Sequence, residues 1–162
     1  MGKLMIINGS PRAPRSNSKQ YAALFREFWP GETDEYNVTA RDHMTACARM
    51  AEAEHILFVF PLYADGVPAV LMRFLQTLEE HVPPSRPTVH ALVNCGFLEP
   101  EQNSVALEMI RLFCNQCGLP FGSSLAIGSG EAILGTPFRF LVKRQIKKLA
   151  RAVAVGRPQA LR

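Results

Sequence analysis

The sequence predicts a doubly wound α/β fold, in which a five-stranded parallel sheet carries helices on both faces. Short apolar runs alternate along the chain with longer stretches that are apolar at every third or fourth residue, the patterns of strands and helices. The two strongest runs, His55–Phe60 and Thr88–Asn94, are apolar on both alternating sets of side chains. Strands buried on both faces of a parallel sheet have this pattern. The length of 162 residues fits one such domain, which we expect to span residues 1–162.

The expected strands differ in strength. KLMIIN, HILFVF and TVHALVN are nearly continuous apolar runs, SLAI is shorter, and EYNVT is the weakest. In chain order, the expected strands are Lys3–Asn8, Glu35–Thr39, His55–Phe60, Thr88–Asn94 and Ser124–Ile127.

The stretches between these strands have helical periodicity. The last of them has six apolar side chains along one side, namely Phe138, Leu141, Val142, Ile146, Leu149 and Val153. Pro30-Gly31 and Pro83-Pro84 fall between elements, where turns belong. In chain order, the expected helices are Ser18–Phe28, Met44–Ala53, Pro68–His81, Gln102–Cys117 and Pro137–Val155.

Composition excludes several classes of protein. With 48% apolar and 20% charged residues, the chain resembles a globular protein and not a disordered one. Its longest uninterrupted apolar run, Ile56–Leu62, is far shorter than the about 18 residues that span a membrane. Met1–Ile7 is too short for a signal peptide, and four cysteines do not indicate a disulfide scaffold. We therefore expect a reduced, cytoplasmic protein without membrane insertion.

The net charge of +4 is unevenly distributed. Eight of the 18 basic residues follow Glu131, where no acidic residue occurs, and the first 138 residues have a net charge of −4. The basic pI therefore reflects the last expected helix, and we predict no nucleic-acid partner. We expect the basic side of that helix to face solvent. Attraction of anionic lipid, nucleic acid or an acidic partner is the alternative.

The loops after the first, third and fourth strands are the expected place for chemistry, because ligands of doubly wound folds bind at the carboxyl ends of strands. The first loop is polar and leads into a helix. Gly9 allows a tight turn, and the helix N-terminus with its exposed N–H groups forms an anion site. Short polar side chains and two cations surround it, namely Ser10, Arg12, Arg15, Ser16, Asn17 and Ser18. The alternative is a polar loop that ends in a helix cap. Neither common glycine-rich phosphate motif is present.

Two sequence motifs resemble those of a known family. IINGSPR, followed by SNS, is similar to the phosphate-binding loop of the NAD(P)H-dependent FMN reductases, which have the flavodoxin-like fold. The segment from Phe60 to Leu71 is similar to the P-x-Y…P-x-x-L pattern of that family. The spacing of the two motifs and the order of strands and helices agree with the resemblance over nearly the whole chain.

The resemblance implies which residues hold the cofactor. Ser10, Arg12, Ser16, Asn17 and Ser18 would hold the FMN 5′-phosphate. Along the edge of the isoalloxazine ring would lie Pro61, Leu62, Tyr63 and Ala64. The loop after the fourth strand would flank the same ligand through Asn94, Cys95, Gly96 and Phe97. For Tyr63 the alternative is an aromatic residue that covers the core, and for the fourth-strand loop it is an ordinary turn.

The resemblance also implies an activity. It implies hydride transfer from NADPH or NADH, as co-substrate, through bound FMN to a flavin, a quinone or another small-molecule acceptor. The cofactor carries this chemistry, so no catalytic side chain is predicted. The family further implies a homodimer with an open cleft. One departure concerns the third helix, where the family often has Lys and Asp and this chain has Met72-Arg73 and Gln76.

Two other functions stay open at this point. The first is a flavodoxin-type electron-transfer module, and the second is a non-catalytic flavin-binding protein with the same fold. Cys114 and Cys117 resemble half of a metal or redox site, but no second pair follows at the spacing of zinc ligands, and we predict no metal site. The four histidines are scattered, and they form no recognisable catalytic triad.

Overall fold

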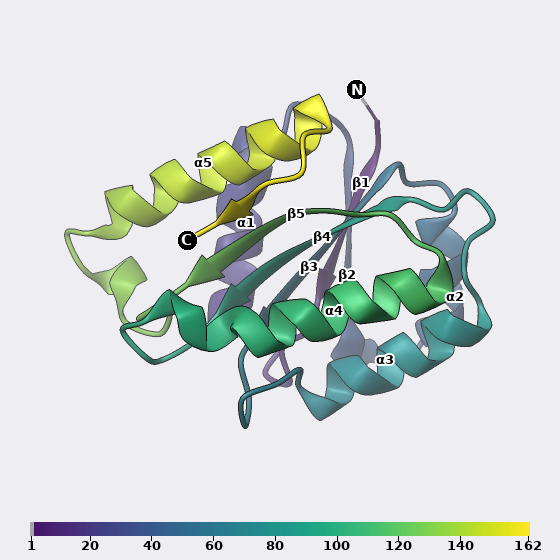
Figure 1. Cartoon of the computed structure of the whole chain (residues 1–162), viewed down its shortest axis with the longest axis horizontal. Coiled ribbons are helices and arrows are strands. Elements are labelled where there is room, and N and C mark those ends of the chain that lie inside the picture. Colours follow the sequence, from purple (N-terminus) through teal and green to yellow (C-terminus); the bar gives the residue numbers. More distant parts are fainter. Residues whose placement is uncertain (1) are drawn as a thin grey trace.

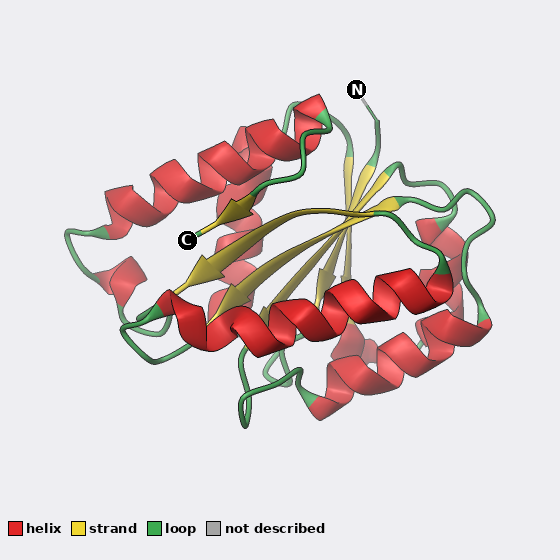
Figure 2. Ribbon diagram, viewed as in Figure 1, coloured by secondary structure: helices red, strands yellow, loops and turns green. Residues whose placement is uncertain are grey.

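The computed structural model describes residues 2–162 and has a six-stranded sheet between two layers of helices (Figures 1 and 2). The strand order is β2-β1-β3-β4-β5-β6, and every pair is parallel. The strands are β1 (Leu4–Asn8), β2 (Thr33–Asn37), β3 (His55–Pro61), β4 (Thr88–Asn94), β5 (Phe121–Ile127) and β6 (Ala160–Leu161). The helices are α1 (Asn17–Phe28), α2 (His43–Met50), α3 (Ala69–Glu80), α4 (Ser104–Cys117) and α5 (Arg139–Val155).

The helices divide between the two faces of the sheet, and each face has its own apolar core. On one face, side chains of α2, α3 and α4 pack against alternate residues of the strands, among them Ile7 and Phe58. On the other face, α1 and α5 cover the remaining set, which includes Ile6, Leu57 and Leu92. Figure 1 shows this arrangement, with α1 and α5 on one side of the sheet and α3 and α4 on the other. The central strands are therefore buried on both faces, as their sequence predicts.

The sheet has six strands, and the prediction of five was wrong by one short edge strand. β6 contains only Ala160 and Leu161, and it pairs with β5 at Ser124 and Leu125. Two residues after a polar turn carry no periodic signal. Their strand character comes from the β5 edge, for example from the Ser124 N–H, which donates to the Gln159 carbonyl at 2.8 Å.

Some boundaries also differ from the expected ones. β2 occupies Thr33–Asn37 instead of Glu35–Thr39, because only these five residues lie opposite β1. Val38–Ala40 then forms a 3₁₀ turn, in which the Val38 side chain is buried. β5 begins at Phe121, three residues before its expected start, since Phe121 already pairs with Val89.

The topology determines where a ligand can bind. After β2 the chain crosses to the other side of β1 and continues with β3, so the strand order reverses between β1 and β3. The loops that leave their carboxyl ends diverge to opposite faces and leave a crevice there. The loops after β4 and β5 end at the same edge of the sheet. In the part of the chain that the structure describes, no helix is both long and apolar enough to span a bilayer.

Candidate functional site

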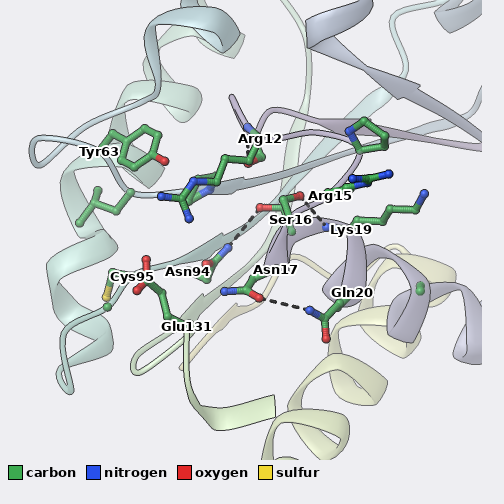
Figure 3. Close-up of a pocket in the computed structure, with 17 residues that line it drawn as sticks. Arg12, Arg15, Ser16, Asn17, Lys19, Gln20, Tyr63, Asn94, Cys95 and Glu131 are labelled. Atoms are coloured by element: carbon green, nitrogen blue, oxygen red, sulfur yellow. Dashed lines mark hydrogen bonds between the residues drawn. The ribbon is translucent and has the colours of Figure 1, made fainter. Parts of the chain in front are cut away.

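A cavity of about 640 Å³ lies at the carboxyl ends of β1, β3 and β4 (Figure 3). It brings together three segments that are distant in sequence, as the loop positions predict. Of the thirteen residues predicted to hold the cofactor, eleven line the cavity: Ser10, Arg12, Ser16, Asn17, Ser18, Pro61, Leu62, Tyr63, Asn94, Cys95 and Gly96. Ala64 and Phe97 lie outside its lining.

The first loop turns sharply after β1 and is held by its own polar groups. The Gly9 N–H donates to the Val59 carbonyl at 2.9 Å. The Ser10 N–H donates to Asn8 Oδ1 at 3.2 Å, and Ser10 Oγ accepts from the Arg12 N–H at 3.2 Å. Asn8 and Ser10 are buried, so the loop leaves the strand in one defined direction.

Gly9 is required here because β3 and α3 pass close to the backbone. A Cβ at this position would lie 2.6 Å from Leu71 Cδ2 and 3.0 Å from Phe60 Cβ. Contacts of that length force neighbouring atoms to shift. The close approach therefore explains a glycine that the sequence indicated only as a turn residue.

The N-terminus of α1 opens into the cavity. Ser16 is the N-cap residue, and its Oγ accepts from the Lys19 N–H at 3.2 Å. The preceding N–H groups, those of Asn17 and Ser18, are in the first turn of the helix and have no intrahelical acceptor. Together with the positive end of the helix dipole, these groups provide an anion site. The side chains of Asn17 and Gln20 form a hydrogen bond of 3.2 Å at the same end.

Three cationic side chains belong to the same cavity. Arg12, Arg15 and Lys19 line the cavity, and none of them forms an ion pair with another described residue. Glu131 is the one acidic residue among the described residues that line the cavity. In the view of Figure 3, Arg15 and Lys19 lie toward one end, and Tyr63 and Glu131 lie toward the other. Arg15 and Lys19 thus make one end of the cavity cationic.

The loop after β3 forms a tight turn at the rim of the cavity. The Leu62 N–H donates to the Asn94 carbonyl at 2.7 Å, which continues the pairing of β3 with β4. Tyr63 and Gly66 exchange two backbone hydrogen bonds of 3.1 and 2.9 Å. Between them, Ala64 and Asp65 have φ of 44° and 60°, as in a type I′ turn. Ala64 therefore lies at the tip of the turn, and the half-exposed Tyr63 ring lies at its base beside the cavity.

Asn94 at the end of β4 ties three elements together under the cavity. Its side chain is buried, and Nδ2 donates to the Phe60 carbonyl at 3.2 Å and to Ser18 Oγ at 3.4 Å. Ser18 belongs to α1 and Phe60 to β3. One amide group thus fixes the helix N-terminus relative to the loop that carries Tyr63.

The Cys95 thiol is engaged inside its own loop and contributes little to the surface of the cavity. Sγ lies 3.7 Å from the Phe97 and Ile127 carbonyls and accepts from Asn103 Nδ2 at 3.4 Å. Burial raises the pKa of the Cys95 thiol, which therefore stays protonated at neutral pH. The exposed backbone of Gly96 faces the cavity, and the Phe97 ring is directed to the surface.

The loop after β5 supplies a part of the site that the sequence analysis missed. The Gly130 N–H donates to the Cys95 carbonyl at 2.7 Å, and the Gly130 carbonyl accepts from the Tyr21 hydroxyl at 2.6 Å. A Cβ on Gly130 would lie 2.7 Å from Asn94 Cβ, so only glycine allows this approach. These contacts bring Glu131 to the cavity. The sequence signal that could have indicated Glu131 is its position shortly after the carboxyl end of β5. Arg15, expected at the anion site, also lines the cavity, and further lining residues that were not predicted are Pro14, Lys19, Gln20 and Ala23.

The described residues contain no group of three histidine, cysteine or acidic side chains that could hold a metal ion. Cys114 and Cys117, which resemble half of such a site, are free thiols on α4. Burial raises the pKa of the Cys114 thiol to about 12. A thiol of this kind is inert at neutral pH.

Comparison with known proteins identifies the fold. No family model matches the sequence, and no curated protein matches it. Among solved structures, an NAD(P)H:quinone oxidoreductase from Methanothermobacter marburgensis superposes with a TM-score of 0.73 at 13% identity, over 94% of this chain and 96% of that one. A flavodoxin from Streptococcus pneumoniae TIGR4 superposes with a TM-score of 0.70 at 14% identity, over 94% and 98%.

A third solved structure is an FMN-dependent NADH-azoreductase from Bacillus anthracis, determined in complex with FMN. It superposes with a TM-score of 0.67 at 12% identity, over 94% of this chain and 99% of that one. The chain therefore has the flavodoxin-like fold. Quinone reductases, azoreductases and a flavodoxin are among its structural neighbours, which is consistent with the resemblance to the FMN reductases.

Proposed function

We propose that this chain binds FMN in the cavity at the carboxyl ends of β1, β3 and β4 and acts as an NAD(P)H-dependent oxidoreductase. The acceptor would be a flavin, a quinone or another small oxidised molecule. One observation carries the proposal: three unpaired cations, an open helix N-terminus and an aromatic ring line the same cavity.

The residues present fit FMN in both size and chemistry. The volume of about 640 Å³ lies within the range of small-molecule sites, about 300–1,000 Å³. At the helix end, the N–H groups of Asn17 and Ser18 and the charges of Arg12 and Arg15 suit a phosphate dianion. At the other end, Tyr63 offers a flat apolar surface for an aromatic ring.

In this proposal the protein binds and orients, and the cofactor supplies the reaction. Bound FMN would provide hydride acceptance and onward electron transfer. Arg12, Arg15 and the cap at Ser16 would hold its phosphate. The backbone from Leu62 to Tyr63 would run along its ring, as the resemblance implies. Asn94 would act as a positioning residue, because its amide fixes α1 relative to β3.

A flavodoxin-type electron carrier is the second candidate, and the likeness to the S. pneumoniae flavodoxin favours it. The composition of the loop after β1 favours the reductase. Carriers of that class commonly have uncharged, hydroxyl-rich phosphate loops, whereas this loop contains Arg12 and Arg15.

Steady-state oxidation of NADH and NADPH by the FMN-loaded protein distinguishes the candidates. We expect turnover with free FMN or with a simple quinone such as menadione, above the rate of a protein-free control that contains the same FMN. Tight FMN binding without turnover on any acceptor would instead indicate the carrier. Absence of FMN binding would exclude both the reductase and the electron carrier.

The homodimer stays a prediction from the resemblance. The resemblance implies that NAD(P)H would stack in an open cleft, and a second copy would complete its walls. Sedimentation velocity of the FMN-loaded protein tests this, and we expect a particle of twice the chain mass of 18.0 kDa.

A further inference from the structure

A second cavity, of about 460 Å³, lies beside the outer edge of β5. It exists because β6 ends early. β6 pairs with β5 only at Ser124 and Leu125, so the next residues of β5, from Ala126 onward, have no neighbouring strand on that side. The first part of α5 and the loop after β4 close the other sides.

The floor of this second cavity is aliphatic. Leu125 and Ile127 of β5 and Val142 of α5 form its buried part. At the rim, Leu98 and Leu141 are 79% and 44% exposed. A ligand in the cavity would therefore remove apolar surface from water.

Cations line the second cavity. Arg144 and Lys148 are four residues apart on α5, so they lie on the same side of the helix. Neither forms an ion pair with another described residue. Arg162 also lines the cavity, and its guanidinium lies 2.9 Å from the Glu101 carboxylate in an exposed pair. Among the described residues that line the cavity, none is acidic.

The second cavity is distinct from the candidate FMN site. The two share no lining residue. The loops after β4 and β5, which are joined by the hydrogen bond from the Ser129 N–H to the Phe97 carbonyl, contribute different residues to each cavity. Gly128 and Ser129 line the second cavity, whereas Gly96 and Glu131 line the first.

We propose that the second cavity binds a small amphipathic carboxylate, with its aliphatic or aromatic body on the floor and its carboxylate at Arg144 and Lys148. The volume suits such a molecule. A wholly polar anion would leave the aliphatic floor exposed, and a neutral apolar molecule would leave the two cations unpaired. Guanidinium and carboxylate groups form strong charge-assisted hydrogen bonds, which gives the site its preference for acids.

Calorimetric titration with octanoate tests the proposal. We expect saturable binding of one octanoate per chain, whether or not FMN is present. Acetate has the charge without the chain, and 1-octanol has the chain without the charge. Each should bind at least about tenfold more weakly, because each lacks one half of the interaction. Absence of octanoate binding, or equal binding of 1-octanol, overturns the proposal.

A matched pair of variants on α5 shows where the charge is needed. Arg144→Gln should weaken octanoate binding about tenfold, since it removes a charge-assisted hydrogen bond. Arg151→Gln removes the same charge from the same helix, but Arg151 does not line the second cavity, and octanoate affinity should stay unchanged. Equal losses in both variants would show non-specific attraction to a basic helix and would overturn the site.

Backbone amide shifts locate the ligand independently. Octanoate should shift the amide signals of Gly128 and Ser129 and leave those of Asn17 and Gly96 in place. The reverse pattern would place the acid in the candidate FMN site and would contradict the proposal. A separate FMN titration of the same sample tests the proposed function. Failure of FMN binding can therefore be distinguished from failure of octanoate binding.

Discussion

At the scale of single residues, His90 shows how burial fixes a protonation state. The ring is 2% exposed, and Nδ1 accepts from the Ser123 N–H at 2.9 Å. The ring proton is therefore on Nε2, which lies 3.3 Å from His55 Nδ1 and donates to it. Burial, and then the neighbouring His55, lower the pKa of His90 to about 3.

This state makes stability depend on pH. In the unfolded chain His90 takes up a proton below about pH 6.5, whereas the folded protein resists protonation down to about pH 3. The free energy of unfolding should therefore fall as pH decreases from about 6.5 toward 3. In His90→Gln this fall should become smaller, by up to about 1.4 kcal/mol per pH unit.

Urea unfolding at several pH values measures this effect. His81→Gln is the matched control, because His81 is exposed and its ring forms a hydrogen bond with the Thr77 carbonyl. Its pH dependence should equal that of the parent protein. If His90→Gln also retains the full dependence, the assignment of the effect to His90 is wrong.

Asn94 is the residue on which the geometry of the site depends most. Its buried amide donates to the Phe60 carbonyl and to Ser18 Oγ. Asn94→Ala removes both hydrogen bonds of this buried amide and should lower the free energy of unfolding by about 1–3 kcal/mol. It should also weaken FMN binding, because α1 loses its connection to β3.

Urea unfolding and FMN titration measure the two effects, and Asn115→Ala on the exposed side of α4 is the control. An unchanged FMN affinity in Asn94→Ala would remove this positioning role.

At the scale of elements, two helices end in the same way but in different surroundings. Gly118 after α4 and Gly156 after α5 have φ of 66° and 68°, a conformation that costs about 1–2 kcal/mol for other residues. A Cβ on Gly156 meets no atom within 4 Å, whereas one on Gly118 meets the guanidinium of Arg86. That guanidinium donates to the Gly118 carbonyl at 2.7 Å.

We therefore expect Gly118→Ala to destabilise the protein more than Gly156→Ala. Gly156→Ala should lower the free energy of unfolding by about 1 kcal/mol through backbone strain alone. Gly118→Ala should cost more, because Arg86 must also move and lose its hydrogen bond. Thermal or urea unfolding of both variants measures the difference. Equal losses would mean that the contact with Arg86 adds nothing.

Which elements could be predicted from the sequence follows from how each one is stabilised. β3 and β4 were predictable because both faces are buried, and burial leaves a continuous apolar run. The position of β2 was off by two residues, since its partner β1, and not its own composition, selects Thr33–Asn37. β6 was not predictable, because a two-residue strand depends wholly on the adjacent β5 edge.

At the scale of the whole molecule, topology explains what the sequence could show of the site. Carboxyl ends of parallel strands meet at one edge, so the loops after β1, β3 and β4 were predictable as neighbours. Glu131 was missed because its approach depends on Gly130 packing against Asn94. The second cavity could not be predicted from the sequence, since it combines residues near Leu98, Ile127 and Arg144 that no motif connects.

The proposed function requires that the cationic end of the first cavity receive the phosphate of FMN. Titration of the protein with FMN and with riboflavin, followed through the visible spectrum of the flavin, tests it most directly, because the two ligands differ only in that phosphate. We predict that FMN saturates at one per chain and binds at least about tenfold more tightly than riboflavin, since Arg12, Arg15 and the α1 N-terminus would interact with the phosphate that riboflavin lacks. An unchanged flavin spectrum, or equal affinity for the two flavins, would contradict the account.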